Sequence, residues 1–134
     1  MTLEQRTVPP RSTVTLRGAP ESVSTARQRV RELLGEGHPA FDDVVLLVSE
    51  VVTNSVVHSC SGGGGRVAMT VAVSPGAVLV EVSDAGSGLS APHVRNEPDA
   101  ESGRGMFLVD LLADRWGIQG DDGGPRTVWF EVRF

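Results

Sequence analysis

The chain has 134 residues, of which 40% are hydrophobic and 22% charged, so it has the size of one domain and enough apolar side chains for one core. Its formal net charge of -5 argues against binding to nucleic acid, which needs clustered positive charge, and no apolar run of about 18 residues predicts a membrane span. All 12 basic residues are arginines, which excludes the lysine of P-loop enzymes, the lysine of eukaryotic-type protein kinases and Schiff-base chemistry.

The N-terminal segment is predicted to contain an arm, a strand and a helix. We expect residues 1–11 to form a flexible arm, and because this arm lacks the apolar stretch of a signal peptide, we expect a cytoplasmic protein. The single cysteine, Cys60, agrees with a reducing compartment. Residues 12–17 alternate as a short strand does. Residues 20–37 carry apolar side chains at helical spacing and predict an amphipathic helix whose charged side chains face water.

A valine-rich segment at residues 42–59 predicts the most apolar helix. Its valines alone would favour a strand, but its length and its polar residues at four-residue spacing favour a helix, which Asp42 or Asp43 could cap. After a run of glycines, residues 66–74 and 77–84 alternate in the way of two strands. A Ser-Pro-Gly turn between them predicts a hairpin.

The C-terminal third is predicted to hold a long loop, a helix and a second hairpin. Residues 85–102 show no periodicity, and loops of this length are uncommon without a function, so we expect a binding loop or lid. A helix should begin near residue 103, and residues 116–119 and 126–134 should pair as strands. The apolar face of that helix is expected to consist of Met106, Leu108, Val109, Leu111 and Leu112.

The order of these elements predicts an α+β two-layer sandwich, with helices on one face of a mixed, mostly antiparallel sheet. We expect a single domain over residues 12–134. Three aromatic side chains, Trp116, Trp129 and Phe130, are expected in its core rather than on a ring-stacking surface.

Glu50 and Asn54 are the first candidate functional residues. They lie four residues apart on the valine-rich helix and therefore share one face, about 5.4 Å apart along the axis. A carboxylate can act as a general base, and an amide oxygen can coordinate a hard cation such as Mg²⁺. The alternative is a solvated polar stripe on an amphipathic helix, which an isolated pair of this kind more often is.

Asp84 is the second candidate. It follows three valines at every other position of its strand, so if the valines face the core, the carboxylate faces inward as well. A buried acid needs donors. The exocyclic amine of adenine is such a donor, whereas guanine has a carbonyl oxygen there. The alternative is that Asp84 only opens a turn before a glycine.

Glycines follow Asp84 and precede the last helix. Gly86 and Gly88 would let the backbone approach a flat ring. Gly103 and Gly105 flank Arg104 just before a helix, where N–H groups and the guanidinium suit phosphate oxygens. The alternative is an ordinary loop-to-helix junction, and a dinucleotide-binding fingerprint is absent because its last glycine is a leucine here.

The succession of these motifs resembles the GHKL ATP-binding superfamily, which includes gyrase, heat-shock chaperones, sensor histidine kinases and anti-sigma-factor serine kinases. SEVVTNSVVHS is similar to its N box, SDAGSGL and SGRGMFLVDLLADRWGI to its two glycine boxes, and GGPRTVWFEV to its final motif. The resemblance extends over residues 12–134 and implies the Bergerat fold. The short length and the wording of the second glycine box resemble the stand-alone anti-sigma kinase branch.

The resemblance implies a role for each candidate. Glu50 would be the general base, Asn54 would bind the Mg²⁺ that bridges the phosphates, and Asp84 would accept the adenine amine. Gly86 and Gly88 would lie by the ring, and Thr127 would support Asp84, through water or directly.

The second glycine box would hold the phosphates as part of the lid, through Gly103, Arg104 and Gly105. Because the lid contains no lysine, Arg104 and Arg95 would supply its positive charge. The absence of a preceding helix with a phospho-acceptor histidine speaks against a histidine kinase.

The function implied is an ATP- and Mg²⁺-dependent serine kinase, an anti-sigma factor that phosphorylates an anti-anti-sigma protein and binds a sigma factor. A homodimer is compatible with the family analogy, and neither nucleic acid nor a membrane is an expected partner. The alternatives are a non-catalytic ATP-binding switch and a slow ATPase.

Overall fold

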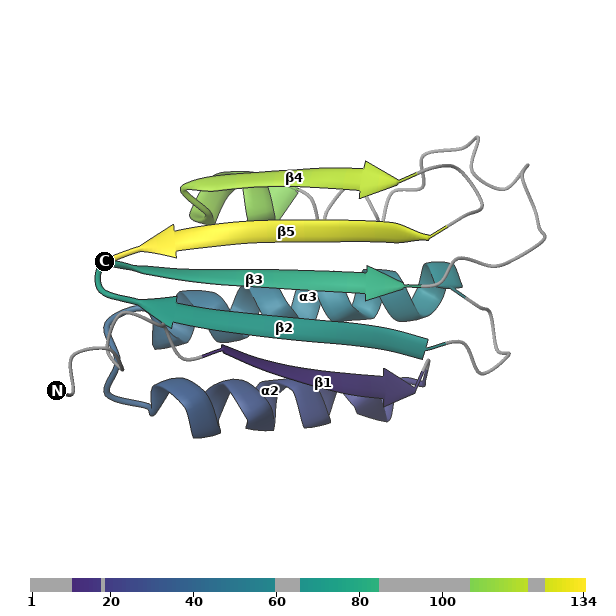
Figure 1. The fold of residues 1–134 in the computed structure, drawn as a ribbon, viewed down its shortest axis with the longest axis horizontal. Coiled ribbons are helices and arrows are strands. Elements are labelled where there is room, and N and C mark those ends of the chain that lie inside the picture. Colours follow the sequence, from purple (N-terminus) through teal and green to yellow (C-terminus); the bar gives the residue numbers. More distant parts are fainter. Residues whose placement is uncertain (1–10, 18, 60–65, 85–106, 121–124) are drawn as a thin grey trace, which may run out of the picture.

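Five strands form one sheet in the computed structural model, which describes residues 11–17, 19–59, 66–84, 107–120 and 125–134 (Figure 1). Their order in the sheet is β1-β2-β3-β5-β4, and all four pairings are antiparallel. This confirms the expected two-layer sandwich with a mostly antiparallel sheet, although the described strands include no parallel pair, so the sheet is not mixed there. The strands are β1 (Arg11–Arg17), β2 (Arg66–Ser74), β3 (Ala77–Asp84), β4 (Arg115–Gly120) and β5 (Arg126–Arg133).

The helices lie on one face of this sheet (Figure 1). They are α2 (Glu21–Leu34), α3 (Phe41–Ser59) and a shorter helical stretch at residues 107–112. In the part of the chain that the structure describes, no helix has the length and apolar character needed to cross a membrane.

The hairpin between β2 and β3 has the bounds that the alternation predicts. Ser74 pairs with Ala77, which leaves Pro75 and Gly76 as the two turn residues. Gly76 has φ of 89°, in the left-handed region, and glycine takes it without the steric cost that a Cβ imposes. The turn therefore fixes the register in which β3 carries Asp84 to the far end of the sheet.

The start of α3 differs from the prediction. The helix begins at Phe41, so Asp42 and Asp43 lie in its first turn and do not cap it. His38 is the residue at the helix entrance, because its Nδ1 accepts a hydrogen bond from the Ala40 N–H at 3.0 Å. The two aspartates still stabilise the helix, since negative charge is favourable near an N-terminus.

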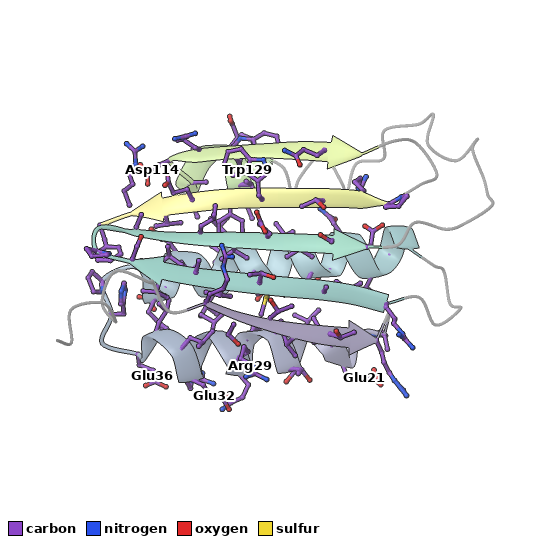
Figure 2. The ribbon with its side chains drawn as sticks, in the orientation of Figure 1. Glu21, Arg29, Glu32, Glu36, Asp114 and Trp129 are labelled. Atoms are coloured by element: carbon purple, nitrogen blue, oxygen red, sulfur yellow. The ribbon has the colours of Figure 1, made fainter. Side chains whose placement is uncertain are left out.

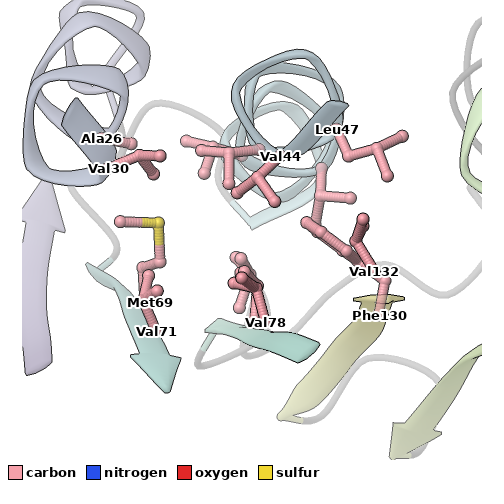
Figure 3. Close-up of a cluster of buried hydrophobic side chains, with 14 of the residues drawn as sticks. Ala26, Val30, Val44, Leu47, Met69, Val71, Val78, Phe130 and Val132 are labelled. Carbon is pink, nitrogen blue, oxygen red and sulfur yellow. The ribbon is translucent and has the colours of Figure 1, made fainter. Parts of the chain in front are cut away.

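The core lies between the sheet and the helices (Figure 3). Side chains of β2, β3 and β5 that alternate toward the helices meet the apolar stripes of α2 and α3. Figure 3 labels nine of the buried side chains: Ala26, Val30, Val44, Leu47, Met69, Val71, Val78, Phe130 and Val132.

The opposite face of α2 is charged, as predicted. Glu21, Arg29 and Glu32 point away from the sheet in Figure 2, as does Glu36 just after the helix. Arg29 and Glu32 approach each other at 3.9 Å, one turn apart. An ion pair exposed to this extent contributes little to stability, so the helix is held by its buried face.

The helical stretch at residues 107–112 follows the prediction only in part. Val109 is fully buried, and Leu108 and Leu112 pack against the core. Leu111 is exposed and does not belong to the apolar face, because in a helix this short only one narrow stripe reaches the sheet. Met106 lies outside the described residues.

The segment after this helix is held by hydrogen bonds to two aspartates of the motif. The Trp116 indole N–H donates to Asp110 at 2.9 Å, and the Arg133 N–H donates to Asp114 at 2.6 Å. Trp116 packs against the core, but Trp129 faces the side of the sheet without helices, over Gly117, so the expectation that Trp129 is a core residue is wrong.

Candidate functional site

The elements that carry the described sequence candidates meet at one end of the sheet. β3 ends there, β5 begins there, and α3 ends at the same end of the molecule (Figure 1). The register agrees, because Asp84 at the end of β3 pairs with Val67 at the start of β2 and with Arg126 at the start of β5. α3 packs against both β2 and β3. The start of β2, the end of β3, the start of β5 and the end of α3 therefore lie at one end of the sheet.

Glu50 lies at the middle of α3, and Asn54 lies one turn further toward its end. Both are half-buried, whereas Thr53 between them is exposed. The neighbouring hydroxyls are used within the helix: Ser49 donates to the Val45 carbonyl at 2.9 Å, and Thr53 to the Ser49 carbonyl at 2.7 Å. The groups left for chemistry at this part of the helix are therefore the carboxylate of Glu50, which can accept a proton, and the amide oxygen of Asn54, which can bind a hard cation.

Ser55 is a polar side chain on the buried face of α3. It is 0% exposed, and its Oγ has no hydrogen-bond partner among the described residues. It continues the stripe of Val48, Val51 and Val52 toward the end of the helix. A buried hydroxyl without a partner is costly, and such groups in folded proteins usually meet a water or a bound group.

Asp84 faces the helices, as its spacing predicts. Val78, Val80 and Val82 are fully buried on the same side of β3, and Asp84 is itself only 6% exposed. Its Oδ2 lies 4.0 Å from Nε of Arg126 on the neighbouring strand. Asp84 is therefore a buried carboxylate next to a positive charge, at the end of the strand.

Thr127 lies on the other face of the sheet. It pairs with Ser83, and the two hydroxyl oxygens are 2.8 Å apart. Since successive side chains of a strand point to opposite faces, Thr127 cannot approach Asp84 from its own strand. The support of Asp84 by Thr127 stays a prediction, and the residue that pairs with Asp84 across the two strands is Arg126.

Arg126 is a charged neighbour of Asp84 that the sequence reasoning missed. The period of two that places Asp84 inward also places Arg126 inward, because Val128, Phe130 and Val132 face the core. That signal was present in the sequence, but the pairing of β3 with β5 was needed to bring the two side chains together.

The remaining candidates lie outside the described residues. They are Gly86, Gly88, Arg95, Gly103, Arg104 and Gly105.

The metal-binding side chains of the described residues suit a metal ion that is held mainly by a bound phosphate compound and water. Among the described residues no group of three His, Cys, Asp or Glu side chains could hold a metal ion. Mg²⁺ commonly takes one or two protein ligands, with water and substrate phosphates completing its octahedron. Asn54 has the oxygen donor for that arrangement, so the residues present are compatible with a magnesium–phosphate complex.

Residues 16–131 match the protein family described as histidine kinase-like ATPase domain. The chain is 28% identical to an anti-sigma F factor of Clostridium acetobutylicum, over 85% of this chain and 87% of that protein. It is 29% identical to a serine-protein kinase RsbW of Listeria monocytogenes, over 83% of this chain and 80% of that protein.

Solved structures have the same fold. The RsbU and RsbW domains of a Mycobacterium tuberculosis protein match 92% of this chain with a TM-score of 0.66 and 25% identity, and this chain spans 32% of that solved chain. The histidine kinase domain of a blue-light activated kinase from Erythrobacter litoralis matches 85% of this chain and 60% of that chain with a TM-score of 0.54 and 23% identity. The second likeness concerns the fold alone.

Proposed function

Because the chain belongs to the histidine kinase-like ATPase domain family, we propose that it is an ATP-dependent serine kinase that acts as an anti-sigma factor. Two relatives, named anti-sigma F factor and serine-protein kinase RsbW, align with most of their length and most of this chain. The observation that supports the proposal is the buried Asp84 at the end of β3, together with the packing of α3, which carries Glu50 and Asn54, against β2 and β3.

Asp84 would form the floor of the nucleotide site. An ionised carboxylate accepts hydrogen bonds and donates none, so it suits the exocyclic amine of adenine. The burial of Asp84 supports this role, because a hydrogen bond to a buried charged group is stronger than one in water. Gly86 and Gly88, which follow it, would allow the ring to approach the backbone.

Glu50 and Asn54 would serve the phosphate end of the nucleotide. Asn54 would hold Mg²⁺, which would supply charge neutralisation at the phosphates. Glu50 would accept the proton of a serine hydroxyl as the hydroxyl oxygen attacks the γ-phosphorus, with ADP as the leaving group. Gly103, Arg104 and Gly105 would hold the phosphate oxygens, and Arg95 would add positive charge.

The serine would belong to a regulatory protein. By analogy with the named relatives, the phosphorylated partner would be an anti-anti-sigma protein, the protein that is sequestered would be a sigma factor, and two copies of this chain would form a dimer. All of these partners are proteins, which agrees with a negative net charge and an absence of lysine.

Phosphate transfer tests the proposal directly. The purified protein is incubated with γ-labelled ATP, Mg²⁺ and candidate anti-anti-sigma proteins, and labelled serine is sought by mass spectrometry. The wild type should label one candidate, and Glu50→Gln should abolish the label while ATP binding is retained. Glu32→Gln is the matched control, because Glu32 is an exposed residue of α2.

The other outcomes separate the alternatives. Phosphate release without labelled protein would indicate an ATPase. ATP binding with neither reaction, in the wild type and in Glu50→Gln alike, would indicate a nucleotide-binding switch. A wild type that binds no ATP would refute the nucleotide site itself.

A further inference from the structure

Asp84 and Arg126 form the last cross-strand pair of β3 and β5. They are paired directly in the antiparallel register, and both side chains lie on the helix-covered face. The Asp84 side chain is 4% exposed and the Arg126 side chain 30% exposed, with Nε and Oδ2 4.0 Å apart. The carboxylate is thus buried beside a guanidinium that still reaches solvent.

A positive charge at this distance affects whether the carboxyl group of Asp84 is ionised or neutral. Burial disfavours the ionised form of an acid, whereas a neighbouring cation favours it. An ionised carboxylate only accepts hydrogen bonds, but a neutral carboxylic acid also donates one through its O–H. The guanidinium therefore biases Asp84 toward a group that accepts and does not donate.

That bias bears on which purine the site can take. Adenine has an amine at its six-position, which donates to a carboxylate. A 6-oxopurine has a carbonyl oxygen there, which meets an ionised carboxylate as one acceptor against another. A neutral acid could donate to that oxygen, so the discrimination depends on the charge of Asp84.

We propose that Arg126 is a specificity-determining residue of the nucleotide site, because its positive charge keeps Asp84 an acceptor and so excludes 6-oxopurine nucleotides. The inference rests on the proposed function, since it takes Asp84 as the residue that meets the purine. Arg126 acts through Asp84 and is a positioning residue rather than a catalytic one.

The test compares ATP with inosine triphosphate, which differs in having the carbonyl oxygen in place of the amine. Affinities are measured by calorimetric titration for the wild type, Arg126→Met and Arg126→Lys. The wild type should prefer ATP by about tenfold or more. Arg126→Met should reduce this preference by about tenfold, chiefly by binding inosine triphosphate more tightly. Arg126→Lys, which keeps the charge, should retain it.

Arg133→Met is the matched control. Arg133 lies on the same strand, and its side chain is 58% exposed and paired with Glu131 on the opposite face. Removing its charge should leave the nucleotide preference unchanged. If Arg126→Met does not fold, Arg126→Gln replaces it, with the fold of each variant checked by circular dichroism.

Three results would overturn the inference. One is an unchanged preference in Arg126→Met. Another is a wild type that binds ATP and inosine triphosphate equally. The third is an equal loss of both affinities in Arg126→Met that Arg126→Lys does not rescue, which would indicate a structural role only. A wild type that binds neither nucleotide refutes the proposed function instead, so the two failures are distinguishable.

Discussion

Two buried serines should respond to the same substitution with opposite signs. Ser55 Oγ is buried without a partner among the described residues, and an unpaired buried hydroxyl costs about 1–3 kcal/mol. Alanine removes that cost and is also the better helix former by about 0.5 kcal/mol. Ser55→Ala should therefore raise the free energy of unfolding by about 1–2 kcal/mol in the absence of nucleotide.

Ser22 is the matched comparison. It is 6% exposed, and its Oγ donates to the Arg17 carbonyl at 2.6 Å. Ser22→Ala loses this bond, worth about 1 kcal/mol, and regains part of that through helix propensity, so the free energy of unfolding should fall slightly.

Urea unfolding, followed by circular dichroism, measures both changes. With slopes of about 1–3 kcal/mol per M, the midpoint for Ser55→Ala should rise by about 0.5–1 M, and that for Ser22→Ala should fall. A midpoint for Ser55→Ala at or below that of the wild type would refute the reasoning, because it would mean that the hydroxyl is already satisfied in the folded protein.

Three further substitutions test the site and the fold. Asp84→Asn should weaken ATP binding by about 1–3 kcal/mol, and an unchanged calorimetric affinity would place the adenine elsewhere. Gly76→Ala should cost about 1–2 kcal/mol and lower the Tm, because its φ of 89° is strained for any residue with a Cβ. The added Cβ would itself meet no atom of the described residues within 4 Å beyond its chain neighbours, so the cost is one of backbone conformation. An unaltered Tm would contradict that strain. Phe130→Ala should cost about 3–5 kcal/mol in urea unfolding because Phe130 is fully buried, whereas Phe107→Ala, at a 62% exposed position, should change stability by less than about 0.5 kcal/mol. Equal effects at the two positions would contradict the assignment of the core.

The regular elements were predictable because their patterns are local. Alternation alone specifies β2 and β3 with the bounds that the structure has, and the valine-rich segment is the helix that its length and polar spacing predict. The start of α3 was not predictable from cap preferences. The helix begins at Phe41, before both aspartates, and the side chain that accepts a backbone hydrogen bond just before it is His38. Leu111 shows the same limit, since exposure depends on which helix positions the sheet can reach.

The direction of each described candidate side chain was predictable from its own element, but the cross-strand pairs were not. The inward direction of Asp84 follows from its own strand, and the shared face of Glu50 and Asn54 follows from helical spacing. The partner of Thr127 was not predictable in this way, because it is defined by the register between β3 and β5, which are separated by more than forty residues in the chain. That register puts Ser83 opposite Thr127 and makes Arg126 the neighbour of Asp84.

The antiparallel register also determines how the protein can be tethered for measurement. Phe134 donates its N–H to the Gly76 carbonyl at 2.9 Å, beside the hairpin where β3 starts, whereas Asp84 is at the other end of that strand. The intervening length of β3 places the two about 24 Å apart. A fluorophore or a surface linker attached behind Phe134 should therefore leave the nucleotide end accessible, and binding kinetics recorded on a sensor chip should agree with those in solution.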